Sequence, residues 1–338
     1  MRENREATPR VTIVVVPREQ YSVARRSLES IFEHTKLPHE LIYVDGPSPA
    51  PLQRWLDAQA RERGFRLLRS RHPLSPNHAR NWALEFASTP YIVFVDNDLI
   101  VTPNWLETLV RCADETDAWA VGPLYLEGEP GDGIIHMAGG HYAFTGEAPE
   151  RSSHTEHLLQ KTPLAELPAP LERGDCAFVE FHCMLCRREI FETLGPLDPA
   201  LLNSREHLDL CIAIEKAGGR VLFEPACLVT YKSPPPLDPG DRGFFWLRWS
   251  EDWTRRSLER FVEKHGIESG YLDRITIATA RRAIAFDPFI RRVRAWCGGG
   301  AAETLRDFVM RAEATLNRLR FRGRSGALCP EDRERANS

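Results

Sequence analysis

Two acidic side chains stand two positions apart at the end of an apolar run, where Asp96 and Asp98 follow Tyr91–Val95. Side chains at positions i and i+2 of a strand point to the same face, so both carboxylates can enter one cleft. Two like charges held this close disfavour folding unless a cation or a hydrogen-bonding ligand lies between them. A hard divalent ion that bridges the carboxylates and a substrate diphosphate meets this need. The simpler interpretation makes Asp98 a cap or turn residue ahead of the next helix.

Two common phosphate-binding loops are missing from the sequence. No G-x-G-x-x-G follows the first predicted strand, and no G-x-x-x-x-G-K-[ST] occurs anywhere. These loops cradle the phosphates of dinucleotides and of nucleoside triphosphates. A dinucleotide oxidoreductase and a P-loop NTPase are therefore both disfavoured.

The first 125 residues alternate between strand and helix signals. Strands are predicted at 11–16, 41–44, 65–68 and 91–95. Between these strands, the helical spacing of apolar residues predicts three helices: one capped by Ser22, one that ends at Gly64, and one over Asn77–Ala87. After the last strand, Thr102-Pro103 predicts the start of a fourth helix. Such alternation predicts parallel strands joined by crossover helices, in a Rossmann-like sheet. Ligands bind these sheets at the carboxyl ends of the strands, which is where the acidic pair lies.

The pattern loosens after about residue 128. Glu147–Pro170 is polar with little periodicity, which predicts a long loop. Strands are predicted at Phe178–Cys186 and Val221–Tyr231, with a helix over Glu206–Ala217 between them.

A proline-rich break, Ser233-Pro234-Pro235-Pro236, separates this region from a stretch with helix signals alone. We therefore divide the chain into three parts: 1–125, 126–235, and a helical extension over 236–338 that ends in a disordered tail.

Composition and charge bound the class of protein. Of the 338 residues 42% are apolar and 27% charged, and the net charge is −4, so no nucleic-acid partner is expected. No apolar run approaches the roughly 18 residues of a membrane span, and the first ten residues lack the apolar stretch of a secretory signal. The eight scattered cysteines predict reduced core thiols rather than disulfides or a zinc site. We expect a cytoplasmic protein.

The charge is unevenly distributed along the chain. Residues 271–324 contain 12 arginines and 5 acidic residues, interleaved with apolar side chains such as Phe289 and Trp296. This mixture predicts peripheral contact of the C-terminal helices with an anionic membrane or with an acidic partner. The simpler interpretation is a solvated face packed on the rest of the chain.

An ordered set of motifs over about residues 10–233 resembles that of the family-2 glycosyltransferases of GT-A fold. The motifs are the 11–16 strand and its helix, Leu41–Asp45, Asn77–Asn81, Tyr91–Asp98, Gly133–Gly140, Arg187–Asp198, Arg205–Cys211 and Ala217–Ala226. The resemblance implies an α/β fold with a Rossmann-like, mostly parallel central sheet flanked by helices. It also implies a nucleotide-sugar-binding half over 1–125 and an acceptor-binding, catalytic-base half over 126–235.

The resemblance implies roles for individual residues as well. Asp45 is expected to bind the nucleobase of the donor, Arg80 its nucleotide or diphosphate, and Asp96 its ribose, although Asp45 can also be read as a turn residue and Arg80 as an exposed helix residue. Asp96 and Asp98 are expected to hold Mn²⁺ or Mg²⁺, which offsets the charge that develops on the departing diphosphate. The full set expected at the nucleotide sugar is Pro17, Arg18, Asp45, Asn77, Arg80, Asp96, Asn97 and Lys232.

A general base must take the proton of the acceptor hydroxyl as that oxygen attacks the anomeric carbon. Family members commonly carry Glu-Asp or Asp-Asp, one further residue and then Asp-Leu at the start of this helix, where this chain reads Glu206-His207-Leu208-Asp209-Leu210. The second acid, often the assigned base, is thus His207 here, which is a first departure from the family. His207 can accept a proton near neutral pH, and Glu206 and Asp209 can take that role or orient the imidazole. All three are candidates; the simpler interpretation is that the acids only favour a helix N-terminus.

A second departure from the family concerns the metal. Many relatives complete the metal shell with a histidine at the end of the next strand, where this chain has Tyr231-Lys232. Lys232 can neutralise a diphosphate directly. His182 is either a replacement ligand or a hydrogen-bonded core residue.

These observations predict an inverting glycosyltransferase that moves a sugar from a nucleotide diphosphate sugar of UDP type to a hydroxyl acceptor, assisted by a divalent metal. The acceptor stays open among a glycan, a lipid-linked glycan, a protein and a small molecule. The alternative, suggested by His207 and Tyr231-Lys232, is a catalytically impaired nucleotide-sugar-binding or scaffold protein of the same fold.

Overall fold

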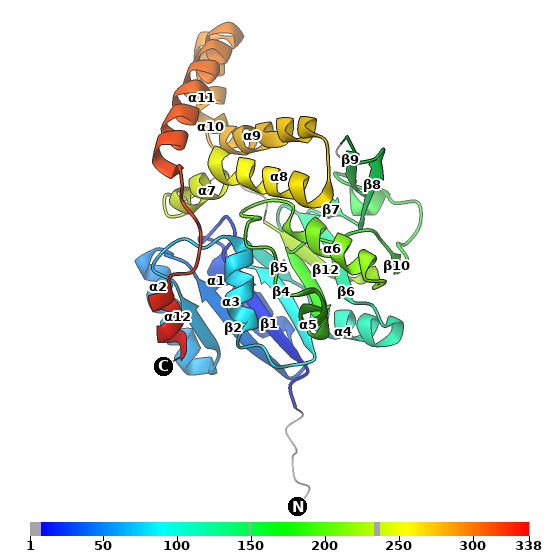
Figure 1. The fold of residues 1–338 in the computed structure, drawn as a ribbon. Helices are drawn as coiled ribbons and strands as arrows, with labels where there is room; N and C mark the ends of the chain where they lie inside the picture. The colour runs from blue at the N-terminus through cyan, green and yellow to red at the C-terminus, as the bar shows by residue number, and fades with distance from the viewer. Residues whose placement is uncertain (1–7, 149, 233–236, 338) are drawn as a thin grey trace, which may run out of the picture.

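A ten-stranded sheet flanked by helices forms the centre of the molecule, and a helical extension lies over one end of it (Figure 1). The computed structural model describes residues 8–148, 150–232 and 237–337. The strand order is β10-β12-β6-β11-β4-β1-β2-β3, with β5 paired to β12 and β7 to β6. Strands β1 to β4 run parallel, as do β6 and β12, whereas β11 is antiparallel to both of its neighbours. The predicted α/β class, with a mostly parallel central sheet, is confirmed.

The elements of the sheet-forming part are β1 (Val11–Val16), α1 (Ala24–His34), β2 (His39–Asp45), α2 (Ala50–Arg63), β3 (Arg66–Arg69), α3 (Pro76–Leu84), β4 (Tyr91–Asp96), β5 (Leu99–Val101), α4 (Trp105–Thr116), β6 (Ala120–Glu127), β7 (Ile134–Met137), β8 (Gly140–Thr145), β9 (Ser152–His157), η1 (Leu164–Glu166), β10 (Gly174–Asp175), β11 (Cys183–Arg187), α5 (Glu189–Leu194), α6 (Glu206–Lys216) and β12 (Val221–Tyr231). The extension comprises α7 (Arg242–Arg248), α8 (Glu251–His265), η2 (Ser269–Ile275), α9 (Thr276–Ile284), α10 (Asp287–Cys297), α11 (Gly299–Phe321) and α12 (Pro330–Asn337).

Local sequence explains the N-terminal part of the sheet well. All six residues of β1 are buried, as expected for a β-branched run covered on both faces. Helix α2 ends at Gly64, whose φ of 72° is the left-handed conformation that glycine adopts without strain. The four predicted strands of this part are all present, and β4 extends one residue further to include Asp96.

Two predicted helix starts are wrong, because distant partners take the capping groups. Ser22 does not cap α1; its backbone N–H and hydroxyl donate to the carboxylate of Asp241 at 3.0 and 2.6 Å. The hydroxyl of Thr102 donates to the Leu228 carbonyl at 2.7 Å, and α4 begins only at Trp105. Both partners lie more than 100 residues away in the sequence.

The predicted long loop over Glu147–Pro170 is wrong in part, since Ser152–His157 within it form β9, which pairs antiparallel with the preceding strand β8 in a hairpin. Side chains of the hairpin alternate between more and less exposed positions, but few are apolar, so the alternation leaves no hydrophobic signal. The hairpin carries His157 at its end.

The predicted strand Phe178–Cys186 is shorter than expected and begins only at Cys183. Residues 178–182 are fully buried but leave the sheet, apart from a bridge between Phe178 and Gly140. This departure turns Glu180 and His182 toward the carboxyl ends of β1 and β4 (see below). The predicted break at 233–236 lies outside the described residues.

The C-terminal residues return to the sheet instead of forming the predicted disordered tail (Figure 1). After α11 the chain passes back toward β3, and the Gly326 carbonyl accepts the Ser75 N–H at 2.8 Å. In α12 the buried carboxylate of Asp332 accepts hydrogen bonds at 3.0 Å from the Ser70 hydroxyl and the Arg71 N–H. Among the described residues, no helix combines the length and apolarity that a membrane span requires.

Candidate active site

The turn after β4 places Asp96 and Asp98 next to each other, both buried, beside the end of β1. Asp96 has three cationic or imidazole neighbours: its oxygens lie 3.2 Å from Arg18, 3.3 Å from Arg80 and 3.0 Å from His182 Nδ1. Asp98 accepts one backbone N–H from the β1 loop at 3.3 Å, and its Oδ1 has no hydrogen-bond partner among the described residues. The charge of Asp96 is therefore compensated by two arginines, although its Oδ2 also lacks a hydrogen bond, whereas Asp98 forms no ion pair among the described residues.

The surroundings move the pKa values of the pair in opposite directions. Burial would raise the pKa of Asp96, but Arg18, His182 and Arg80 bring it down to about 2. For Asp98, burial and then the neighbouring Asp96 charge raise the pKa well above its ordinary value. Burial and the Arg18 charge lower the pKa of His182 to about 4, so its imidazole is uncharged at neutral pH. A cation bound beside Asp98 would favour the ionised form of this carboxyl group.

Helix α3 directs two predicted donor-binding residues toward β4. Arg80 is buried rather than exposed, and its guanidinium carbon lies 4.0 Å from the centroid of the Phe181 ring. Burial lowers its pKa to about 10, so it remains protonated at neutral pH. Asn77 accepts a hydrogen bond from Arg80 at 3.3 Å and donates to the Asp198 carbonyl at 2.9 Å. Arg80 is thereby fixed against the Asp96 carboxylate.

The β1 loop joins the same site. Pro17 is buried, and the backbone N–H of Arg18 donates to Asn97 Oδ1 at 2.8 Å, which ties this loop to the turn after β4. The guanidinium of Arg18 also lies 5.7 Å from the centroid of the Tyr231 ring. The structure thus brings Arg18, Asn97 and Asp96 together, with Pro17 next to Arg18 in the chain.

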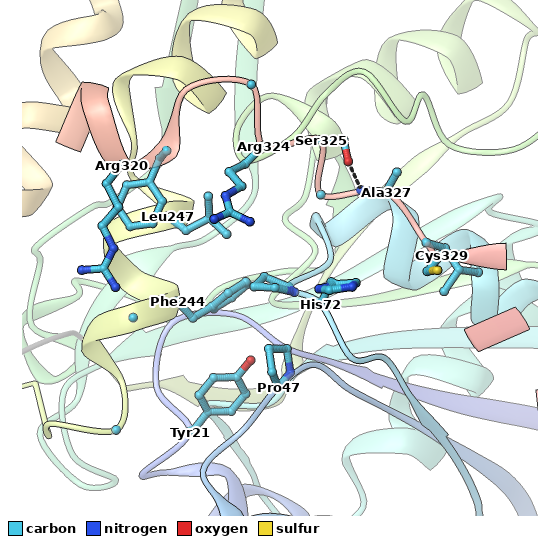
Figure 2. Close-up of a pocket in the computed structure, with 17 residues that line it drawn as sticks. Tyr21, Pro47, His72, Phe244, Leu247, Arg320, Arg324, Ser325, Ala327 and Cys329 are labelled. Carbon is cyan, nitrogen blue, oxygen red and sulfur yellow. Dashed lines mark hydrogen bonds between the residues drawn. The ribbon is translucent and has the colours of Figure 1, made fainter. Parts of the chain in front are cut away.

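Asp45 ends β2 two residues before Pro47, which lines a cavity of about 720 Å³ (Figure 2). Its buried carboxylate accepts from Arg69 at 3.0 Å, while Asp45 Oδ1 has no hydrogen-bond partner among the described residues. Burial raises the pKa of this group. Figure 2 shows Tyr21 and Pro47 on one side of the cavity and the C-terminal segment, with Arg324 labelled, on the other. This segment was not among the predicted site residues.

A second polar cluster lies beside the acidic pair; we call it the Glu180 centre, comprising Glu180, His136, His157, His182 and His207. Glu180 Oε2 lies 3.0 Å from His136 Nε2 and 3.4 Å from His182 Nε2. Glu180 Oε1 lies 3.4 Å from His157 Nε2 and 3.9 Å from His207 Nε2. Because Nδ1 of His182 faces Asp96, this one ring connects the Glu180 centre to the acidic pair.

The imidazoles of the Glu180 centre differ in protonation. Burial would raise the pKa of Glu180, but His182, His136 and His157 hold it well below its ordinary value. Burial would lower the pKa of His136, but the Glu180 charge raises it to about 9. Burial lowers the pKa of His207 to about 3, so its ring is neutral near pH 7.

The three candidate bases on α6 point in different directions. His207 reaches the Glu180 centre. Asp209 accepts from Lys264 at 2.7 Å and from His265 at 2.9 Å, which engages it with α8. Glu206 is buried 3.9 Å from a buried arginine of α7. The structure therefore brings only one of the three to the cluster.

Tyr231 ends β12 and Lys232 follows it, at the position where the resemblance implied a histidine ligand. The ammonium group of Lys232 forms an ion pair with Glu129, and its backbone N–H donates to the Asp98 carbonyl at 3.1 Å. The Tyr231 ring packs on His182, with 4.1 Å between the centroids. An imidazole is thus present at the acidic pair, supplied by the segment before β11 instead of by β12.

These donors fit a divalent ion. One ligand atom each from Asp96, Asp98 and His182 lie within 4.8 Å of one another, and Asp98 Oδ1 is buried with no partner within the described ranges. Carboxylate oxygens with one imidazole suit Mn²⁺ or Mg²⁺. His157, Glu180 and His207 form a second set with the same spread.

Sequence analysis missed three members of the Glu180 centre as site residues: Glu180, His136 and His157. The usable signal was Glu180, an acid within an otherwise apolar run that predicts a buried strand. A buried acid in such a run requires a partner, whose identity the sequence does not reveal. The buried pair Glu19 and Arg248, 3.8 Å apart, also escaped prediction.

Comparison with known proteins identifies the family of this chain. Residues 12–195, more than half of the chain, match the family described as "Glycosyl transferase family 2". The chain is 28% identical over 226 residues to the O-antigen biosynthesis protein RfbC of Myxococcus xanthus, and 26% identical over 222 residues to a pre-mycofactocin glycosyltransferase of Mycobacterium tuberculosis. These matches cover 64% and 65% of this chain but 16% and 42% of those proteins, so the chain spans less than half the length of either.

Two solved structures share the fold. One is a mannosyltransferase from Pyrobaculum calidifontis in complex with GDP-Man and Mn²⁺, at a TM-score of 0.50 and 16% identity, over 92% of this chain and 85% of that one. The other is GalNAc-T7 with UDP, GalNAc and Mn²⁺, at a TM-score of 0.50 and 17% identity, over 78% of this chain and 56% of that one. At these identities the likeness establishes the fold, which is of the GT-A glycosyltransferase type.

Proposed function

Because the chain belongs to glycosyl transferase family 2, we propose that it transfers a sugar, with inversion, from a nucleotide diphosphate sugar of UDP type to a hydroxyl acceptor. The observation that carries this proposal is the acidic pair: Asp98 is buried next to a second carboxylate, and one of its oxygens has no hydrogen-bond partner in the part of the chain that the structure describes. Leaving a carboxylate in this state destabilises the fold, so the arrangement favours an active site over a scaffold that has lost its ligand.

The donor is proposed to lie across the loops after β1, β2 and β4. Asp45, which ends β2 next to the cavity that Pro47 lines, is the residue proposed to accept an N–H of a nucleobase such as uracil. Arg18 and Arg80 place two guanidinium groups at Asp96, where they can also contact the diphosphate. Lys232, next to the Asp98 backbone, is a further proposed diphosphate contact.

We assign Asp96, Asp98 and His182 as the residues that hold Mn²⁺ or Mg²⁺. Such an ion, when bound, neutralises the negative charge that builds up on the leaving diphosphate. Other residues of the chain hold these ligands in position. Arg80 and Arg18 form ion pairs with Asp96, and the Tyr231 ring packs on the imidazole of His182.

The acceptor hydroxyl is proposed to enter at the Glu180 centre. Its oxygen forms a bond to the anomeric carbon while the bond from that carbon to the diphosphate oxygen breaks, and the electron pair leaves with the diphosphate. The hydroxyl proton passes to the Glu180 centre, of which His207 is the member from the helix that carries the family's base. The His207 ring is neutral near pH 7 and can accept a proton, but the lowering of its pKa by burial makes it a weaker base than a solvated imidazole. Glu206 and Asp209, engaged with α7 and α8, are proposed to stabilise the helix instead.

Thermal unfolding of the wild-type chain with a panel of nucleotide sugars, with and without Mn²⁺ or Mg²⁺, tests the donor proposal. Ligands that bind only the native state raise the melting temperature with the logarithm of their concentration over Kd. We expect a UDP-sugar with a divalent ion to give the largest shift. A GDP-sugar giving the largest shift would overturn the UDP assignment, and no shift with any donor would contradict the site itself.

The projecting helices α10 and α11 are proposed to contact an anionic membrane (Figure 1). They carry seven arginines against four acidic residues, and Trp296 and Phe308 are 89% and 70% exposed. Exposed aromatic side chains with neighbouring arginines favour the headgroup region of a lipid surface. The alternative, a solvated face packed on the rest of the chain, is disfavoured by these exposures.

Flotation with vesicles of anionic lipid at low salt tests this contact. The wild-type chain should float, and Arg291→Gln/Arg292→Gln should weaken binding by about 10-fold or more, at about 1 kcal/mol for each arginine at the surface. Arg54→Gln/Arg61→Gln, which removes two exposed arginines of α2, is the matched control and should bind as wild type. Equal losses for both variants, or no flotation of the wild type, would contradict the proposal.

A further inference from the structure

Two imidazole nitrogens of the Glu180 centre face a carboxylate without a good hydrogen bond to it. His157 Nε2 and His207 Nε2 lie 3.4 and 3.9 Å from Glu180 Oε1. Hydrogen bonds between nitrogen and oxygen usually span about 2.7–3.2 Å. Among the described residues, neither Nε2 atom has another hydrogen-bond partner. The side chains of His157, His207 and Glu180 therefore point toward one another, but the distances between them are too long for good hydrogen bonds.

These separations suit ligands that share one metal ion. Two ligands about 2.1 Å from an ion in tetrahedral geometry lie about 3.4 Å apart. The ligand atoms of His157, Glu180 and His207 all lie within 4.8 Å of one another. Glu180 is buried, whereas His157 and His207 are partly exposed, so an ion there would retain a coordination position open to solvent.

The residues around this set hold the carboxylate in place. Glu180 Oε2 forms a hydrogen bond of 3.0 Å with His136 Nε2, and His136 Nδ1 lies 3.4 Å from Glu127. Carboxylate–imidazole chains of this kind orient the ligands of metal sites from the second coordination shell. On the far side, Phe178 packs against both His157 and His207, with ring centroids 5.6 and 5.7 Å apart.

We propose that His157, Glu180 and His207 bind a transition-metal ion of the Zn²⁺ type, in a site separate from Asp96 and Asp98. Two imidazoles and one carboxylate favour borderline ions, whereas the oxygen-rich acidic pair favours Mn²⁺ or Mg²⁺. The inference rests on the proposed function only in placing this ion on the acceptor side, where it would help the acceptor hydroxyl to lose its proton to solvent. With the ion bound, His207 Nε2 would be a ligand and would not take that proton itself. Binding of the ion itself requires no transfer activity.

The test uses the full chain without a histidine tag, stripped with a chelator and titrated with Zn²⁺ in excess Mg²⁺. Calorimetry and metal analysis should find one zinc ion per chain. His157→Ala and His207→Ala should each weaken zinc binding by more than about 100-fold, and Glu127→Gln, outside the ligand set, by about 10-fold. Asp98→Asn should bind zinc as the wild type does.

His154→Ala is the matched control, because His154 is an exposed histidine on the same strand β9. It should leave zinc binding unchanged, and circular dichroism should show every variant folded. Substitution with Co²⁺ should give d–d bands without thiolate charge transfer, which separates this site from the eight free cysteines. Thiolate bands, unchanged zinc binding in both ligand variants, or no stoichiometric zinc would each overturn the proposal.

The two proposals fail in different ways. A chain that binds zinc but no nucleotide sugar would contradict the proposed donor and leave the zinc site standing. A chain that transfers sugar but binds no zinc would overturn the zinc site alone.

Discussion

Replacement of Asp98 by Asn is expected to lower the rate of sugar transfer by about 10³-fold, equivalent to about 4 kcal/mol of transition-state stabilisation. The substitution removes the one carboxylate of the acidic pair that the chain leaves uncompensated. The shift in melting temperature caused by Mn²⁺ with the donor should disappear as well. Steady-state transfer rates and thermal unfolding, measured on the same preparations, check both effects.

The melting temperature of the variant distinguishes a loss of catalysis from misfolding. Asp98→Asn removes a repulsion between buried carboxylates, so its melting temperature without ligand should equal or exceed that of the wild type. Asp96→Asn should instead destabilise the chain by about 3–5 kcal/mol, since it leaves the buried Arg80 without its charge partner. Asp307→Asn, which alters an exposed carboxylate of α11, serves as the neutral control. Full transfer activity in Asp98→Asn would contradict the assigned site.

Replacement of His207 by Ala is expected to lower transfer by about 10²-fold or more while donor binding stays unchanged. His207 lies at the Glu180 centre and has no contact with the proposed nucleotide-binding residues among the described ones. The loss should therefore appear in kcat and not in the donor-induced thermal shift. Both are measured at saturating acceptor.

Asp209→Asn gives the opposite pattern and tests the alternative base. It breaks the contacts with Lys264 and His265, so the melting temperature should fall while kcat at lower temperature stays near that of the wild type. If Asp209→Asn abolished transfer in a folded chain and His207→Ala did not, the acid would be the base and the assignment of His207 would be wrong.

The parts of the fold that depend on neighbouring residues could be predicted from sequence. The β-branched run of β1, and the apolar stretch that ends in Asp96 and Asp98, signal buried strands by themselves. The position of the acidic pair at the carboxyl end of a parallel strand then follows from the topology.

The parts that depend on distant residues could not be predicted. His136, His157 and His207 reach Glu180 from β7, β9 and α6, and no local pattern encodes that convergence. The β8–β9 hairpin is too polar for its alternation to show as hydrophobic periodicity. Asp241 removed Ser22 from its expected capping role across 219 residues, which only the folded chain reveals.

For Glu206, His207 and Asp209 of α6, the local structure could be predicted from sequence but the contacts with distant residues could not. Their spacing on a helix was predictable, and so was the start of that helix at Glu206. Which of them faces the site depends on α8, whose Lys264 and His265 engage Asp209. Sequence alone left the three as equals, and packing against the C-terminal helices distinguishes them.

The central claim is that this glycosyltransferase transfers a sugar with inversion from a donor held at Asp96 and Asp98. Proton NMR of the wild-type chain, supplied with the donor selected by thermal shift, a divalent ion and a panel of hydroxyl acceptors, tests it most directly. The account predicts release of the nucleoside diphosphate together with a product whose anomeric configuration is opposite to that of the donor, and no such product with Asp98→Asn. A product that retains the donor's configuration, or equal turnover in Asp98→Asn, would contradict it.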